Sequence, residues 1–267
     1  MGKKDKKEKK KKKKKRAAAE AALALEAMPL SDPVPSGKPA YDPASHPQPA
    51  VTVDVVLLTI ADGELRVLLI RRDLPPFEGE HALPGGFVRI DESLDDAAGR
   101  ELREETDVEV RFLEQLYTFG DVGRDPARRV VTVAYYALVD AAPLDPHAGT
   151  DARTVAWFPI DALPPMAFDH RRIVDYAVER LRYKTEYAPV AFQLLPESFS
   201  LTDLQSVYET ILARPLDKRN FRRKVHSLEI LEPTGDERRD GPGRPAALYR
   251  FRTEKFGDLG GGVVLDF

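Results

Sequence analysis

One stretch, from Gly86 to Val108, constrains this chain more than any other. It reads GFVRIDESLDDAAGRELREETDV. Its second half is predicted to form a helix, because Ser93 can cap the first turn and Asp96, three residues later, is a weaker form of the capping-box acid. The stretch therefore predicts a loop that leads directly into a helix of about three turns.

The predicted helix carries three carboxylates on one face. Glu101, Glu104 and Glu105 fall at positions i, i+3 and i+4, which are neighbours on a helix surface. Such a stripe suits a hard, oxygen-seeking cation such as Mg²⁺, with phosphate oxygens completing its coordination. Arg100, four residues before Glu104, can hold a carboxylate in position while it stays charged. A solvated acidic face is the competing interpretation, and the fixed spacing back to Glu92 and Gly86 argues against it.

These residues resemble the Nudix box, GX5EX7REUXEEXGU, in which U is a bulky apolar residue. Every position matches except the late glycine, which is Asp107 here. The resemblance implies a Mg²⁺ or Mn²⁺ site and a catalytic set. In that set Glu101, Glu104, Glu105 and the carbonyl of Gly86 bind the metal. Glu92 supports the metal cluster, and Arg100 orients the glutamates. Asp tolerates the left-handed backbone of a helix end, so the departure affects the helix exit more than the metal site.

The charge of the chain is unevenly distributed. The 267 residues carry a formal net charge of −3, yet residues 1–16 hold 12 lysines and arginines against two acids. We expect this lysine-rich arm to be disordered, and either to touch nucleic acid or anionic lipid or only to aid solubility. The absence of cysteine excludes disulfides and thiolate chemistry. No apolar run reaches the length of a membrane span, so we expect a cytoplasmic protein with no membrane partner.

Composition divides the chain into four parts. Residues 1–49 are predicted to be the arm followed by a proline-rich linker, and residues 255–267 a short tail. Between residues 50 and 188, β-type runs alternate with two main helical patterns, and Asp62-Gly63 signals a hairpin. The prediction is an α/β (α+β) sandwich with a mixed sheet, in agreement with the Nudix α/β/α fold.

Residues 189–254 follow a different plan. The amphipathic pattern FSLTDLQSVYETILA, with Ser200 or Thr202 as its cap, precedes a basic pattern, KRNFRRKVHSL, and two β-like runs joined by a polar turn. This order predicts a winged helix-turn-helix domain that binds double-stranded DNA. The competing interpretation is a dimerisation surface with solvated arginines. The predicted DNA contacts lie on the basic helix and the turn: Lys218, Arg219, Arg222, Arg223, His226 and Arg244.

Together the two parts resemble the NrtR-type transcriptional regulators of NAD metabolism and related ADP-ribose pyrophosphatases. LDKRNFRRKVHSLEILEPTG, GRPAALYRF, GRDPARRVVTVAYYAL and AFDHRRI carry this resemblance, which covers roughly residues 50–253. It implies a homodimer and a nucleoside diphosphate-linked ligand, with ADP-ribose favoured. Residues near the box and in the polar loop are expected to contact that ligand: Arg71, Arg72, Gly85, Phe87 and Arg124.

The resemblance leaves two functions open. In one, a metal-dependent hydrolase splits ADP-ribose into AMP and ribose 5-phosphate. In the other, a non-catalytic sensor of ADP-ribose binds an operator. Some regulators of this family have lost box glutamates, whereas this chain keeps all of them, so we expect hydrolysis together with DNA binding. A protein-interaction module that neither turns over nor binds the ligand is the third and weakest possibility.

Overall fold

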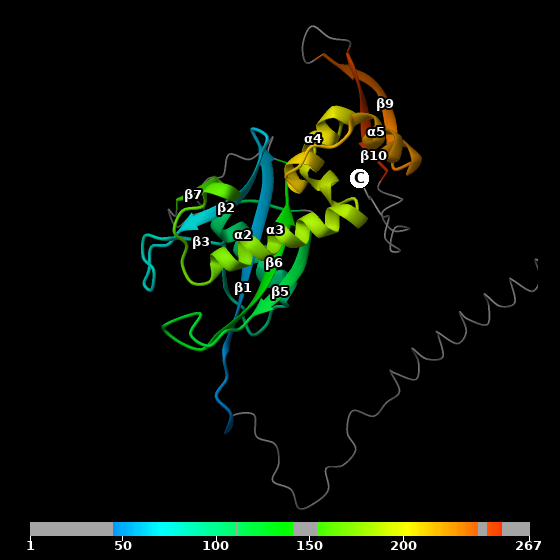
Figure 1. The fold of residues 1–267 in the computed structure, drawn as a ribbon. Coiled ribbons are helices and arrows are strands. Elements are labelled where there is room, and N and C mark those ends of the chain that lie inside the picture. The colour runs from blue at the N-terminus through cyan, green and yellow to red at the C-terminus, as the bar shows by residue number, and fades with distance from the viewer. Residues whose placement is uncertain (1–44, 111, 141–153, 240–244, 253–267) are drawn as a thin grey trace, which may run out of the picture. The chain divides into compact units, whose positions relative to one another are not determined.

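The computed structural model describes residues 45–110, 112–140, 154–239 and 245–252 (Figure 1). The predicted arm, most of the linker and the tail lie outside the described residues, as does Arg244. Within the described part of the chain, no helix combines the length and apolar character that a membrane span needs.

A mixed sheet forms the centre of the first part, as predicted. Strand β1 pairs in parallel with β6 and antiparallel with β2, and the path through the sheet runs β3-β2-β1-β6-β5. Two short strands join beside this path, β4 on β1 and β7 on β2. The strands are β1 (Ala50–Ala61), β2 (Glu64–Arg71), β3 (His81–Ala82), β4 (Gly85–Phe87), β5 (Leu113–Phe119), β6 (Val130–Leu138) and β7 (Val155–Pro159). The hairpin at Asp62-Gly63 is present, with both residues at positive φ as a tight turn requires.

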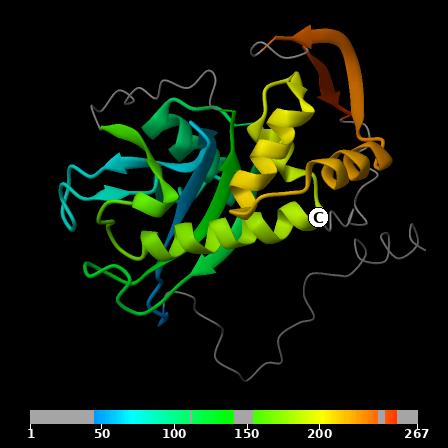
Figure 2. The same ribbon diagram turned by 45° about the horizontal axis from the view of Figure 1, so that its top comes forward.

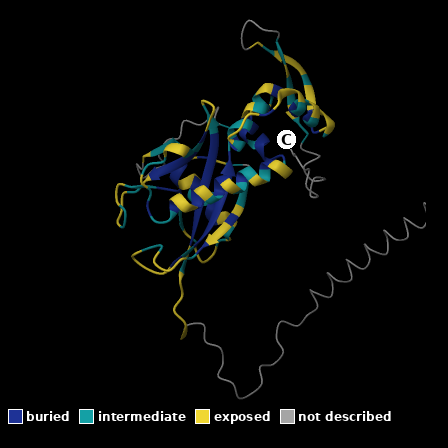
Figure 3. Cartoon of the chain, viewed as in Figure 1, coloured by how far each residue is buried: buried dark blue, intermediate teal, exposed yellow. Residues whose placement is uncertain are grey.

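Helices α2 (Leu94–Thr106) and α3 (His170–Tyr187) cover opposite faces of this sheet (Figure 2). The alternation of strand side chains explains the arrangement. Val55 and Leu57 of β1 pack in one hydrophobic cluster with α2, while Val56 and Leu58 pack in the other with α3. Both faces of β1 are therefore buried (Figure 3). The predicted α/β/α sandwich is confirmed.

The ends of α2 follow the sequence-based expectations. Ser93 caps the helix by accepting a hydrogen bond from the Asp96 amide. Asp107 ends it in the left-handed conformation at φ 56°, and its amide donates to the Arg103 carbonyl. An aspartate thus performs the turn for which the family motif uses glycine. After this turn Val108 packs with the α2 cluster, and strand β5 begins at Leu113.

The C-terminal part is a winged helix-turn-helix, again as predicted. Helices α4 (Leu201–Leu212) and α5 (Lys218–Ser227) are followed by the wing strands β9 (Leu231–Arg238) and β10 (Ala246–Phe251). Strand β8 (Phe199–Ser200) completes a three-stranded sheet in the order β8-β10-β9. Ser200 caps α4 through a full capping box with Asp203.

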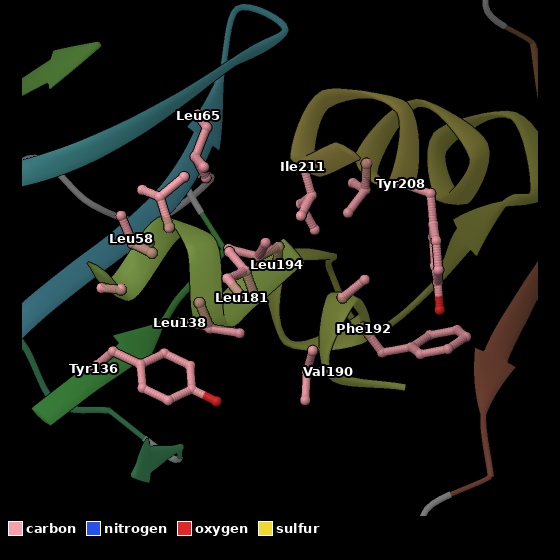
Figure 4. Packing of buried hydrophobic residues seen from close by; sticks show 14 of the residues in the cluster. Leu58, Leu65, Tyr136, Leu138, Leu181, Val190, Phe192, Leu194, Tyr208 and Ile211 are labelled. Carbon is pink, nitrogen blue, oxygen red and sulfur yellow. The ribbon is translucent and has the colours of Figure 1, made fainter. Parts of the chain in front are cut away.

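One hydrophobic cluster extends from the first sheet into the winged helix (Figure 4). Leu58 and Leu65 of the sheet and Leu181 of α3 belong to the same cluster as Tyr208 and Ile211 of α4. Two short 3-10 segments, η2 (Ile160–Ala162) and η3 (Val190–Leu194), were not anticipated from the sequence. Segment η3 supplies buried residues to the cluster immediately after the expected boundary at residue 188.

Candidate functional site

The Arg100 side chain lies at the centre of the Nudix-like box. Its Nε and Nη2 donate to the two carboxylate oxygens of Glu92 at 2.8 and 2.6 Å. Its Nη1 donates to Glu101 at 2.7 Å and to Glu104 at 3.1 Å, and Nη2 also reaches the Phe87 carbonyl at 3.3 Å. One guanidinium therefore holds three of the four predicted box carboxylates, as its fork of donors permits.

This arrangement shifts the proton affinities of Glu92 and Arg100. Hydrogen bonds from Arg100 are the main cause that lowers the pKa of Glu92 to about 2, although desolvation opposes the shift. Hydrogen bonding to Glu92 likewise raises the pKa of Arg100 above its ordinary value. Glu92 is therefore ionised at neutral pH, and while it is paired with Arg100 it is a weak base.

Glu105 and Glu101 meet the backbone that precedes the helix. The buried Glu105 accepts a hydrogen bond from the Gly85 amide at 2.9 Å. Glu101 lies so close to Gly86 that a Cβ at Gly86 would be 2.4 Å from its Oε1. The glycine thus leaves space for a carboxylate beside a backbone carbonyl, which is an all-oxygen donor set of the kind that Mg²⁺ prefers.

The donor types therefore fit the predicted metal, with Glu101, Glu104, Glu105 and the Gly86 carbonyl as the residues that would hold it. Across residues 45–110, 112–140, 154–239 and 245–252, no three acidic or histidine side chains converge closely enough to hold an ion. The reason is visible in the contacts, since Glu101 and Glu104 are drawn to Arg100 while Glu105 is turned to Gly85.

The other predicted ligand contacts lie in different environments. Arg71 is exposed and donates to the Gly79 carbonyl, and Arg72 donates to Pro76 and Leu74 carbonyls while stacking 4.8 Å from the Phe168 ring. Phe87 is half-exposed and lies under the Arg128 guanidinium at 4.1 Å. As a half-exposed aromatic residue of the box loop, Phe87 is suited to stacking on a base.

Arg124 differs from these residues because its side chain is only 4% exposed. It donates to both carboxylate oxygens of Asp169, with distances of 2.6 to 3.2 Å, and to Asp54 at 3.3 Å. Burial disfavours the guanidinium charge, but the two carboxylates more than offset it and raise the pKa of Arg124. The loop that carries Arg124 is thus joined to β1 and to the start of α3.

Sequence reasoning missed the residues that receive Arg124. Asp54 lies within an apolar strand pattern, and Asp169 and His170 belong to AFDHRRI, a segment that in the sequence alone carries only the family resemblance. Buried His170 accepts a hydrogen bond from the Leu83 amide at 3.0 Å, and its Nε2 faces Asp54 at 3.6 Å. An Asp-His pair directly before a helical pattern was the only available signal.

The predicted DNA-binding residues occupy α5, with the exception of Arg244. Lys218, Arg219, Arg223 and His226 are exposed, whereas Arg222 is half-buried. Arg222 donates to the Thr202 hydroxyl of α4 at 3.4 Å. The exposed basic face of α5 therefore lacks Arg222, which instead contacts the preceding helix.

Comparison with known proteins agrees with both parts of the fold. The NUDIX domain model matches residues 48–177, and the model of the NrtR DNA-binding winged helix domain matches residues 191–251. The ADPR responsive transcriptional repressor NtrR of Acinetobacter baylyi is 36% identical over 220 residues, which cover 81% of this chain and 87% of that protein. The ADP-ribose pyrophosphatase of Methanocaldococcus jannaschii is 36% identical over 129 residues, covering 48% of this chain and 73% of the enzyme.

A solved structure gives the same result over most of the chain. The crystal structure of Shewanella oneidensis NrtR complexed with a 27mer DNA matches with a TM-score of 0.68 and 38% identity, over 78% of this chain and 95% of that one. The two family models place a Nudix domain directly before an NrtR winged helix in this chain. This chain therefore belongs to the NrtR family, in which a Nudix domain is fused to a DNA-binding winged helix.

Proposed function

We propose that this protein is a DNA-binding transcriptional regulator whose affinity for DNA responds to ADP-ribose bound in its Nudix domain. The observation that carries the proposal is the exposed basic face of α5, placed as the second helix of a winged helix-turn-helix. In that architecture the second helix enters the major groove. Two relatives that cover most of the chain are a repressor that responds to ADPR and a protein crystallised with DNA.

Within α5, the exposed basic side chains are those of Lys218, Arg219, Arg223 and His226. Asp217 caps the helix by accepting from the Asn220 amide, so the first turn is fixed. Arg223 also receives support from the helix itself, since its guanidinium donates to the Asn220 side chain at 2.7 Å. A pre-positioned arginine loses less side-chain entropy when it binds a phosphate or a base edge.

The test is a pair of charge reversals measured with a duplex that wild-type protein selects from a random pool. Arg223→Glu should weaken DNA binding by at least tenfold. It should also reduce the slope of log affinity against log salt concentration by the amount expected for about one phosphate contact. Arg171→Glu changes the charge equally at an exposed site on α3 and should have little effect. Binding that survives Arg223→Glu but disappears when residues 1–16 are deleted would assign DNA binding to the lysine arm.

We propose hydrolysis as a second activity of the same domain, acting on the diphosphate of ADP-ribose or a related compound. The observation in its favour is that all the box carboxylates are retained and remain within contact distance of Arg100 or of the Gly85–Gly86 backbone. A divalent ion bound there would neutralise diphosphate charge and increase the acidity of a water molecule. The chain would hold that ion through Glu101, Glu104, Glu105 and the Gly86 carbonyl, while Arg100 keeps the carboxylates in place.

Hydrolysis is tested by incubating the protein with ADP-ribose, with and without Mg²⁺, and following AMP by chromatography. The expected result is AMP that forms only with metal and falls at least a hundredfold in Glu104→Gln. If ADP-ribose is left intact but raises the melting temperature, the domain is a sensor without turnover. Intact ADP-ribose and an unchanged melting temperature would contradict both proposals for this domain.

A further inference from the structure

The segment Leu83–Gly86, which leads into the box, is held from both faces of the sheet. On the α2 side, the Gly85 amide donates to Glu105 at 2.9 Å. On the α3 side, the Leu83 amide donates to Nδ1 of His170 at 3.0 Å. Between these two contacts, the Pro84 carbonyl accepts from the Val55 amide of β1 at 2.8 Å. Helix α2 therefore contacts this segment through Glu105, and helix α3 contacts it through His170.

The contact with His170 is specific in its chemistry. Because Nδ1 accepts from a backbone amide, the proton of the neutral ring is on Nε2, which faces Asp54. Asp54 is in turn held by Arg124, which also binds Asp169 at the start of α3. The first residues of α3 are thus joined both to the box segment and to strand β1. The side chains of Asp54, His170 and Arg124 are buried, and Asp169 is partly exposed.

The segment has little room to move independently. A Cβ at Gly85 would lie 2.2 Å from the Val53 carbonyl oxygen and 2.8 Å from Asp54 Oδ1, so the backbone is packed directly on β1. A displacement of Gly85 or Gly86 must therefore either stretch the hydrogen bond between Leu83 and His170 or carry His170 with it. For occupation of the site to reach α3, a ligand bound beside Gly86 must produce such a displacement.

The other end of α3 contacts the winged helix. Nε of Arg182 donates to the Ile211 carbonyl of α4 at 3.0 Å, and Leu181 belongs to the cluster that contains Ile211 and Tyr208 (Figure 4). From His170 to Arg182 the helix rises about 18 Å. A single rigid element therefore touches the box segment at its first residue and α4 near its last turn.

We propose that His170 is a positioning residue that transmits occupation of the Nudix site to the DNA-binding helices through α3. This inference rests on the ligand-responsive DNA binding proposed above and adds the physical route by which the response travels. Arg124 assists by fixing Asp54 and Asp169 around the same helix end. The equilibrium that both ligands bias is the placement of α3 relative to the box segment.

The test measures the dissociation constant of the full-length protein for the selected duplex, with and without saturating ADP-ribose. The quantity compared between variants is the ratio of these two dissociation constants. Linkage requires a coupled system to show a ratio different from one, and a typical coupling is about five- to 150-fold. His170→Gln moves the polar group towards the Nε2 position and away from Leu83, so the ratio should fall below twofold. His170→Asn keeps an acceptor near Nδ1, and most of the ratio should remain.

A control separates coupling from loss of stability. Ile173 is buried on α3 one turn further along, in the same hydrophobic cluster as Leu83, and its aliphatic side chain makes no hydrogen bond. Ile173→Val loosens the packing of the same helix, so the melting temperature should fall while the wild-type ratio persists. Should His170→Gln fail to fold, Arg124→Lys serves in its place. Lysine keeps the charge but lacks the guanidinium donors that bind Asp54 and Asp169 together, so the ratio should fall at least threefold.

The possible failures are distinguishable. A wild-type ratio above fivefold that is unchanged in His170→Gln or, in its place, Arg124→Lys would overturn this inference and leave the proposed function intact. A ratio lost equally in Ile173→Val would also overturn it, because any loosening of α3 would then be sufficient. A wild-type protein whose DNA affinity ignores ADP-ribose would overturn the proposed function and the inference together.

Discussion

Replacing Gly85 with alanine tests how closely strand β4 is held against β1. The added Cβ would lie 2.2 Å from the Val53 carbonyl oxygen, whereas an ordinary contact needs about 3.5 Å. The obstacle is backbone in the middle of the sheet, so it cannot move aside as a flexible side chain would. Strand β4 must therefore shift outward by roughly 1 Å.

The shift removes contacts whose values can be summed. It stretches the bond between Val55 and Pro84, which contributes about 1 kcal/mol, and the charge-assisted bond between Gly85 and Glu105, which contributes about 2 kcal/mol. We therefore expect Gly85→Ala to lower the free energy of unfolding by about 3 kcal/mol. The matched control is Gly99→Ala in α2, where a Cβ has nothing within 4 Å. Helix propensity predicts that this control gains about 0.5–1 kcal/mol.

Urea unfolding of the full-length chain, followed by circular dichroism, measures both variants. The slope of the unfolding free energy with urea should stay constant, so that the midpoints report stability alone. A loss below about 1 kcal/mol in Gly85→Ala would refute the argument, since it would mean that β4 can withdraw from β1 without losing its hydrogen bonds.

Three further predictions concern other parts of the chain. Asp107→Gly should raise the free energy of unfolding by up to about 1 kcal/mol, because glycine adopts φ 56° without strain; a clear loss in urea unfolding would show that the aspartate side chain matters. Ser200→Ala should cost about 1 kcal/mol by the same measurement and leave the α4 amides of Thr202 and Asp203 without their acceptor. Burial lowers the pKa of His170 below its ordinary 6.5, so the unfolded chain binds the proton more readily and stability should fall as pH drops below about 6.5, by at most about 1.4 kcal/mol per pH unit. His170→Asn should remove that part of the pH dependence, and an equal slope in both proteins would contradict the assignment.

Most of the fold could be predicted from the sequence because its signals are local. The Asp62-Gly63 turn, the Ser93 cap and the alternating strands each depend on residues within a few positions of one another. The left-handed Asp107 could also be anticipated, since helix ends restrict the residue types that follow them. The same holds for α4 and α5, whose apolar stripes and caps are complete within each segment.

The remainder depended on contacts between distant residues. Spacing placed Glu101, Glu104 and Glu105 on one face, but it could not show that Glu105 turns to the Gly85 amide while Arg100 takes the others. Likewise, Arg124 looked like a loop arginine free to meet a ligand, and only the fold brings Asp54 and Asp169 to it. Exposure of a charged side chain is set by tertiary neighbours, which periodicity does not report.

The parallel pairing of β1 with β6 has a consequence for how the chain folds. Ala50 lies opposite Val130 and Leu58 opposite Leu138, so the central contact joins residues 80 positions apart. Such non-local pairing slows folding, because a long loop must close before the contact forms. During synthesis, β1 can meet β2 at once but must wait for β6. The face of β1 that packs on α3 stays uncovered for longer, until α3 has been synthesised. We expect the nascent chain to be most prone to aggregation between the synthesis of β1 and that of α3.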